Sequence, residues 1–497
     1  MRAPNLTGAL RSNMVGEVAL RLPQLVFDGL AARLLIPSEF GVLTGFRMLL
    51  QLTPYLPSIA TSGLDLRYSG LIGAGDAISA RQVAGTAWLL VLLATAAQLL
   101  ALGVGLGSPV LREALSPGAS REQYGFILVA VATQGVYVFL VSHLRNQLKF
   151  TAVNSALLVG NAIALFVLVL MISRLRVTAA IIAYALSMLV AVALWSRRVD
   201  LEMPMRSVFQ REGWFLLQLG GPLLLIGFAF DSVRLLTRWV VGQQFGTEGL
   251  GFLGVAYMVS GVVYLMGTSA SRVMVQFMAR AEGERITHEE QIRHFFMAPA
   301  LGVLSIVAGA TITIYLASQV LLPLWAPAQA GALPLLRPAL YGAMLLTMSF
   351  LYMTLFRAQQ RFRLLAVSTF AAFLILGGFL CGVYVLRLDL YWYVISEAAS
   401  FSLLLALLSV MTHRTVSINQ RPFILTTFAV IGMTAFGLEL GSYLAERTAT
   451  NRFCALSIEC AASLGTAIFW VPLVFRTRRA LNGVAKGEGL NMSTTTA

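Results

Sequence analysis

Four charged residues lie inside the first long apolar stretch of the sequence, residues 14–36, which reads MVGEVALRLPQLVFDGLAARLLI. They are Glu17, Arg21, Asp28 and Arg33. About 20 apolar residues suffice to cross a bilayer, but a charge at the centre of such a helix costs about 2.5–3.5 kcal/mol even on a lenient scale. These side chains must therefore face protein or water, as the lining of a binding site within a membrane would.

The spacing of the polar residues supports that interpretation. At about 100° per residue, Glu17, Arg21, Gln24 and Asp28 fall in a stripe about 60° wide on one side of a helix. Pro23 lies mid-span, where the missing N–H favours a kink. The stripe favours a substrate cavity, and the alternative is a set of ion pairs that fix helix packing.

A second charged stretch follows about 200 residues later, at residues 214–241. Asp231, Arg234 and Arg238 share one helix face at i, i+3 and i+7, and Pro222 again interrupts the pattern. Two charged, proline-bearing stretches of this kind predict an internal duplication.

Composition identifies the class of protein. The chain has 497 residues, of which 58% are hydrophobic and 12% charged, whereas soluble domains carry about 25% charged residues. The formal net charge of +14 fits basic cytoplasmic loops, and no nucleic-acid-binding motif is present. We therefore expect no nucleic-acid partner. The three cysteines form no CxxC pair and the histidines are scattered, so we expect no metal site and no other cofactor.

Hydropathy predicts an all-α polytopic membrane protein with about fourteen transmembrane helices. The predicted spans are 14–36, 40–62, 83–106, 123–144, 151–173, 177–196, 213–241, 250–275, 295–322, 334–356, 364–386, 389–411, 422–444 and 455–475. With both termini in the cytoplasm, 22 of the 36 Lys and Arg residues fall on the cytoplasmic side and 8 on the outer side. We therefore expect a multi-pass protein of the bacterial inner membrane with both ends cytoplasmic.

The remaining six arginines all lie in spans 1, 2, 7 and 8 and are Arg21, Arg33, Arg47, Arg234, Arg238 and Arg272. Arg33 and Arg272 sit near span ends, where long side chains reach the interface. Span 2 adds Gln51 to the same face as Arg47, and span 8 carries Tyr257 and Tyr264. For the hydroxyl groups, ordinary helix–helix hydrogen bonding is the alternative to a binding role.

The duplication is also visible where the second span of each half begins. GVLTGFRM at Gly41–Met48 corresponds to GFLGVAYM at Gly251–Met258. A repeat of six spans, an even number, gives two lobes of the same orientation, related by an axis along the membrane normal. The predicted organisation is an N-terminal lobe, a C-terminal lobe, an extra helix pair and a cytoplasmic tail, at residues 1–198, 199–415, 416–476 and 477–497.

Two stretches carry a family resemblance. ARLLIPSEFGVLTGF, residues 32–46, resembles the start of the Wzx-type polysaccharide flippases of the multidrug/oligosaccharidyl-lipid/polysaccharide (MOP) exporter superfamily. Residues 245–284 resemble the matching region of the second half. The resemblance implies two six-helix lobes around a cationic cavity and alternating access. It also implies a substrate, an undecaprenyl-pyrophosphate-linked oligosaccharide flipped between leaflets for exopolysaccharide or O-antigen synthesis.

Residue chemistry agrees with that substrate. Arginine offers paired donors suited to phosphate oxygens, so we expect the pyrophosphate to be held by Arg21, Arg47, Arg234 and Arg238. The sugar would meet Gln51, Tyr257 and Tyr264. We expect Glu17, Asp28 and Asp231 to balance the charge of the empty site or to carry the coupling ion. Membrane lipid is a further partner, and a polysaccharide polymerase and co-polymerase are candidate partners in the pathway.

Other functions remain as alternatives. A lipid II flippase of the same superfamily ranks second, because the sequence lacks the strongly charged linker expected of that group. A cation-coupled exporter ranks third, because such proteins usually have twelve spans and often carry cationic substrates. A membrane enzyme such as a polysaccharide polymerase ranks last. The outer loops are short and carry no carboxylate pair or nucleophile triad, so we expect no enzymatic activity.

Overall fold

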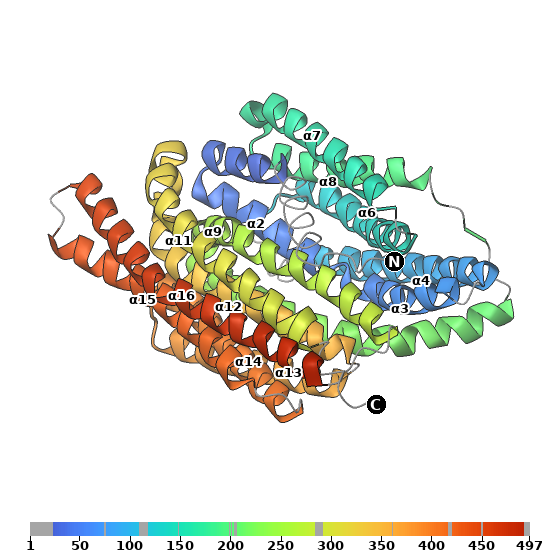
Figure 1. Ribbon diagram of the computed structural model, residues 1–497. Coiled ribbons are helices and arrows are strands. Elements are labelled where there is room, and N and C mark those ends of the chain that lie inside the picture. The colour runs from blue at the N-terminus through green and yellow to red at the C-terminus, as the bar shows by residue number, and fades with distance from the viewer. Residues whose placement is uncertain are drawn as a thin grey trace. The chain divides into compact units, whose positions relative to one another are not determined.

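The part of the chain that the computed structural model describes is helical and contains no strand (Figure 1). The described residues are 23–73, 76–108, 118–147, 149–197, 199, 201–202, 206–283, 292–359, 361–415, 420–448 and 451–491. The prediction of an all-α fold is therefore confirmed for these residues.

The second predicted span is a broken helix. After a helix over residues 23–34, α2 (Pro37–Leu52) begins at a proline, and the N–H of Ile36 donates to Glu39 Oε2 at 3.1 Å. Pro54 then separates α2 from α3 (Tyr55–Gly73), because proline lacks the N–H that a continuous helix needs. The prediction of one continuous span over residues 40–62 is corrected to two helices.

Four regular helices follow, α4 (Ala77–Gly107), α6 (Arg121–Asn146), α7 (Phe150–Leu175) and α8 (Val177–Ser196). Asp76 caps α4 by accepting the N–H of Ser79 at 3.0 Å. Arg176 alone joins α7 to α8, with a φ of 50°, and its guanidinium forms two hydrogen bonds to the Glu39 carboxylate. α7 packs along α8, and α8 along α6 (Figure 1).

The long helix α9 (Arg206–Gly283) is two helices joined at a sharp bend. Gly246 has φ 65° and ψ −163°, a conformation that glycine adopts without steric cost. The bend falls between the predicted spans 213–241 and 250–275, so these two spans are the arms of α9. Pro222 lies inside the first arm.

The remaining elements are η1 (Ile292–Met297), α11 (Ala298–Trp325), η2 (Pro327–Ala332), α12 (Leu333–Ala358), α13 (Phe362–Val385), α14 (Leu390–Thr415), α15 (Arg421–Thr448) and α16 (Arg452–Asn491). α14 packs against α12 and α13, and α15 pairs with α16. Arg337 of α12 donates to Glu439 of α15 at 2.9 Å, and Tyr315 of α11 donates to Glu459 of α16 at 3.3 Å. These bonds attach the extra helix pair to its neighbours.

Eleven helices within the described residues are long and apolar enough to cross a membrane. They contain twelve of the predicted spans, because the two arms of α9 fall within one of the eleven. The first predicted span is described only from residue 23, and the second is the broken pair α2 and α3. The polytopic architecture is confirmed.

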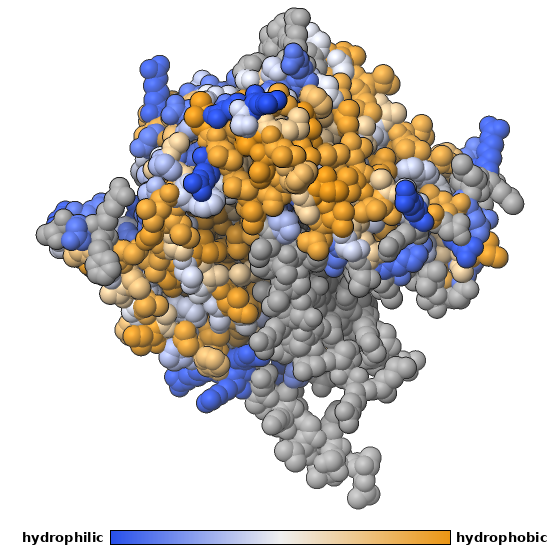
Figure 2. All heavy atoms as spheres, turned by 90° about the horizontal axis from the view of Figure 1, so that it is seen from above, coloured by the Kyte–Doolittle hydropathy of each residue, from blue (hydrophilic) through white to orange (hydrophobic). Residues whose placement is uncertain are grey.

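Large apolar side chains cover much of the outside of these helices. Leu100 and Val104 on α4 are 72% and 79% exposed, and Phe469 on α16 is 70% exposed. Figure 2 shows hydrophobic residues over broad areas of the surface, with hydrophilic residues in smaller groups. Such a surface is stable in contact with lipid, so the protein is a multi-pass membrane protein.

The chain forms two compact units, Leu20–Val255 and a second that holds Ala256–Ala497. The first arm of α9, from Arg206, packs within the first unit, although the repeat assigns it to the C-terminal lobe. The lobe boundaries at residues 198, 415 and 476 follow the repeat of spans and stay a prediction.

Candidate substrate-binding site

A row of polar contacts joins α2 and α3 to the first arm of α9 within the first unit. Arg238 Nη1 donates to Gln51 Oε1 at 2.6 Å. Four residues along the chain from Gln51, the Tyr55 hydroxyl donates to the Asp231 carboxylate. Because the contacts run 51 to 238 and 55 to 231, the two segments are antiparallel.

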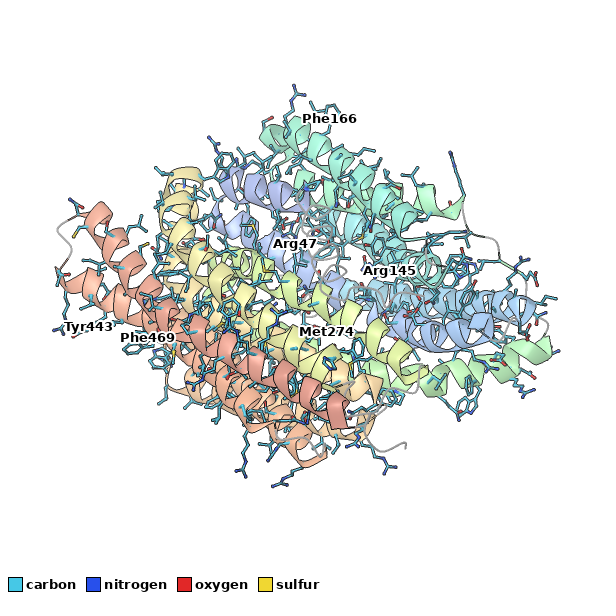
Figure 3. All side chains as sticks on the ribbon, viewed as in Figure 1. Arg47, Arg145, Phe166, Met274, Tyr443 and Phe469 are labelled. Atoms are coloured by element: carbon cyan, nitrogen blue, oxygen red, sulfur yellow. The ribbon has the colours of Figure 1, made fainter. Side chains whose placement is uncertain are left out.

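Arg47, one turn before Gln51, forms the next contact of this row. It is labelled in Figure 3 and pairs with Asp28 of the first described helix. The side chains of Arg47 and Asp28 are 19% and 11% exposed, so both charges are largely removed from solvent. Burial of a single charge would be costly, and pairing reduces that cost.

Two aromatic rings flank the same guanidinium. Arg47 Cζ lies 5.6 Å from the ring centroid of Tyr184 on α8 and 6.0 Å from that of Phe27. Tyr184 in turn packs edge-on against Phe46, with ring centroids 5.7 Å apart. The Arg47 cluster, formed by Phe27, Asp28, Arg47 and Tyr184, thus draws on three helices.

Glycines allow α9 to approach at both ends of the row. A β-carbon on Gly220 would meet the carbonyl oxygen of Ile59, and one on Gly63 would meet that of Leu216. Beyond these glycines, Arg67 binds the Glu212 carboxylate through Nε and Nη2 at 3.3 and 3.2 Å.

The other end is closed by a reciprocal contact between the repeated segments. A β-carbon on Gly41 would meet the carbonyl oxygen of Thr247, and one on Gly251 would meet that of Pro37. Both pairs of equivalent residues differ by 210, since 251 − 41 and 247 − 37 give the same number. Reciprocity of this kind marks a two-fold axis, and it agrees with the predicted parallel repeat.

The predicted site residues divide between the two units. Asp28, Arg47, Gln51, Asp231 and Arg238 all take part in the row of contacts in the first unit. The half-buried Arg234 lies on the same face of α9, three residues from Asp231 and four from Arg238. Glu17 and Arg21 lie outside the described residues.

Two predicted sugar-binding tyrosines belong to the second unit. Tyr257 is 6% exposed and donates to the Glu397 carboxylate, which is itself 2% exposed. The Tyr264 ring packs edge-on against Phe350, with centroids 5.4 Å apart. Both hold packing positions in this structure, and their contact with sugar stays a prediction.

Sequence reasoning missed three residues of the row, namely Phe27, Tyr55 and Tyr184. Tyr55 carried a signal, because it lies four residues after Gln51 on the helical face that also holds Arg47. Tyr184 carried none, since it lies more than 130 residues from Arg47 in an otherwise apolar stretch.

The guanidinium groups of the row suit an anionic ligand. Arg47 and Arg238 supply guanidinium groups, whose geometry matches the oxygens of phosphate and carboxylate. Among the described residues, no group of three or more His, Cys, Asp or Glu could hold a metal ion.

The model of one known protein family matches more than half of the chain. A family model described as "Polysaccharide biosynthesis protein" matches residues 30–327. This range contains Arg47, Gln51, Asp231, Arg234 and Arg238. No curated protein matches the sequence.

Solved transporter structures share the fold. An inward-facing multidrug resistance MATE family transporter of the MOP superfamily is similar with a TM-score of 0.62 and 16% identity, over 80% of this chain and 96% of that chain. Its outward-facing counterpart gives 0.60 and 16%, over 82% and 94%. The lipid II flippase MurJ, in an inward closed conformation, gives 0.63 and 11%, over 93% and 98%. The fold implied by the sequence resemblance is therefore confirmed.

Proposed function

Because this chain belongs to the polysaccharide biosynthesis protein family and shares the fold of a MATE transporter of the MOP superfamily and of the lipid II flippase MurJ, we propose that it flips an undecaprenyl-pyrophosphate-linked oligosaccharide repeat unit. The transfer runs from the cytoplasmic to the periplasmic leaflet of the bacterial inner membrane, by alternating access, with both termini in the cytoplasm. The product serves exopolysaccharide or O-antigen synthesis. A polysaccharide polymerase and co-polymerase act on it next.

The observation that carries the proposal is the pair of arginines in the row of contacts. Arg238 is 8% exposed and the Arg47 side chain 19% exposed, within helices whose outer surfaces face lipid. Cations in such a place are expensive and mark a function. A pyrophosphate carries several negative charges and strong hydration, so cations must replace its water when it moves through the protein.

The acidic partners give the site a balanced resting state. Asp28 holds Arg47, and Asp231 receives the Tyr55 hydroxyl on the face of α9 that carries Arg234 and Arg238. An incoming phosphate would take the place of Asp28 at Arg47, because it offers more acceptor oxygens and more charge. Release of the phosphate on the periplasmic side would restore the ion pair between Arg47 and Asp28. Asp28, Asp231 and Glu17 are accordingly the candidates for charge balance or ion coupling.

The sugar needs hydrogen-bonding groups rather than charge. Gln51, which is exposed and accepts from Arg238, is the candidate for contact with the first sugar. Tyr257 and Tyr264 of the second unit are further candidates, and each contacts another side chain in this structure.

The experiment is complementation of a deletion strain, with lipid-linked repeat units assayed on each face of the membrane. Loss of the protein should leave repeat units on the cytoplasmic face and abolish surface polysaccharide. Arg234→Ala and Arg238→Ala should fail to restore export although folded protein is present. The matched control is Arg174→Ala, because Arg174 is exposed at the end of α7. Normal export by both site variants would refute the assignment.

A lipid II flippase is the second candidate, because its carrier is also an undecaprenyl pyrophosphate and the arginine pair suits both substrates. The same strain separates the two. Repeat units retained inside, with normal cell-wall synthesis, support the polysaccharide substrate. Arrested wall synthesis supports lipid II, and repeat units that reach the periplasm unjoined would point to a polymerase.

A further inference from the structure

Three side chains of the Arg47 cluster contact the guanidinium. The rings of Tyr184 and Phe27 lie 5.6 and 6.0 Å from Arg47 Cζ, and Asp28 accepts from Nη2. Phe27 is 3% exposed, and the Tyr184 ring is itself supported by Phe46. A ring face attracts a cation through its quadrupole and offers it no competing acceptor. The rings therefore restrict the guanidinium without accepting a hydrogen bond from it, and Asp28 accepts from its Nη2.

The predicted internal repeat allows the surroundings of Arg47 to be compared with the equivalent positions of the second half. The reciprocal glycine contact sets an offset of 210 residues between the halves, since 251 − 41 = 210. At this offset Tyr257 takes the place of Arg47. Tyr257 contacts Glu397 of α14, where Arg47 contacts Tyr184 of α8. The position of Phe27 is taken by Thr237.

The second half thus lacks both the cation and the two rings at the equivalent positions. The helices that carry them are common to both halves, so the fold alone does not require aromatic residues there. The two rings thus occur together with the arginine in the first half.

We propose that Tyr184 and Phe27 are positioning residues that hold Arg47 for one phosphate group of the lipid-linked pyrophosphate, which exchanges with Asp28. This inference rests on the proposed function and deepens it. It assigns phosphate recognition at this position to the first half of the chain. It also predicts that binding of the phosphate depends on the aromatic ring of Tyr184 and not on its hydroxyl group.

The test compares two lipids that share the same tail, undecaprenyl pyrophosphate and undecaprenol, binding to the full-length protein in lipid nanodiscs. Tyr184→Leu should weaken binding of undecaprenyl pyrophosphate about three- to tenfold and leave binding of undecaprenol unchanged. Tyr184→Phe and Tyr184→Trp should bind both lipids as the wild type does. Phe27→Leu provides a second variant in case Tyr184→Leu does not fold.

The matched control is Tyr137→Leu, because the Tyr137 ring of the same unit packs on Trp195, with centroids 5.2 Å apart. It should leave the preference for the pyrophosphate lipid unchanged. If the wild type prefers the pyrophosphate lipid and the Leu variants prefer it equally, the positioning role is wrong while the proposed function stands. If the wild type binds the two lipids equally, the proposed function itself fails.

Discussion

At the scale of the residue, the central feature is a charge pair that a ligand can replace. Arg47 and Asp28 neutralise one another within helices that cross the membrane, and two rings cover the guanidinium. Removing one partner of a buried ion pair leaves the other charge unpaired, which costs about 3–5 kcal/mol. An anionic substrate supplies the negative charge that Arg47 needs, and the displaced Asp28 carboxylate must then take up a proton or another partner.

The exchange predicts the behaviour of Asp28→Asn. Arg47 would lose its internal competitor, so undecaprenyl pyrophosphate should bind about tenfold more tightly. Export should nevertheless fall, because the carboxylate that helps to expel the phosphate is missing. Binding is measured in nanodiscs and export in the deletion strain. Weaker binding by this variant would show that Asp28 supports the site instead of competing for it.

At the scale of the element, the row of contacts depends on how closely helices approach. α2 meets the second arm of α9 where Gly41 and Gly251 bring backbone against backbone. Small residues permit such approach between helices in membranes, where packing replaces the hydrophobic effect as the main attraction. Pro54 and Gly246 supply the break and the bend that direct the segments.

This packing predicts opposite effects for two glycines of the same arm. Gly251→Ala should lower the thermal stability, because the new methyl group would meet the Pro37 carbonyl oxygen. Gly261→Ala should preserve or raise it, since a β-carbon there meets nothing within 4 Å and alanine favours helix by about 1 kcal/mol. Thermal unfolding in detergent measures both. Equal effects would contradict the close approach at Gly251.

At the scale of the whole molecule, a flippase must open to each side of the membrane in turn. The repeated segments touch at Thr44 and Gly254, which are also equivalent at the offset of 210, since 254 − 44 = 210. Alternating access requires these segments to separate during the cycle. Helices that belong to the same lobe can stay in contact throughout the cycle.

A disulfide can test this difference. A β-carbon at residue 254 would lie 3.1 Å from Thr44 Cβ, and one at residue 135 would lie 3.0 Å from Thr95 Cβ. In a background without Cys381, Cys454 and Cys460, oxidation of Thr44→Cys/Gly254→Cys should stop export, and a reductant should restore it. Thr95→Cys/Gly135→Cys, which joins α4 to α6, should export normally when oxidised. Export by the first oxidised pair at the wild-type rate would exclude separation of these segments.

The sequence by itself determined the helices, their apolar faces and the arginines that must be kept out of contact with lipid. These features follow from local composition and period, because a span needs about 20 apolar residues and a charge within it has a known cost. The match between Gly41–Met48 and Gly251–Met258 also predicted the repeat, and the glycines it aligns approach one another closely.

Only the tertiary structure decided which polar groups meet. Gln51 binds Arg238 from 187 residues away, and Tyr55 reaches Asp231 across 176. Helical periodicity fixes the face on which a residue lies, but not the register of one helix against another. That register depends on where glycines permit contact and where Pro54 and Gly246 redirect the chain. For the same reason Tyr257, polar and well placed in the sequence, is buried against Glu397, while Tyr184 packs on the arginine.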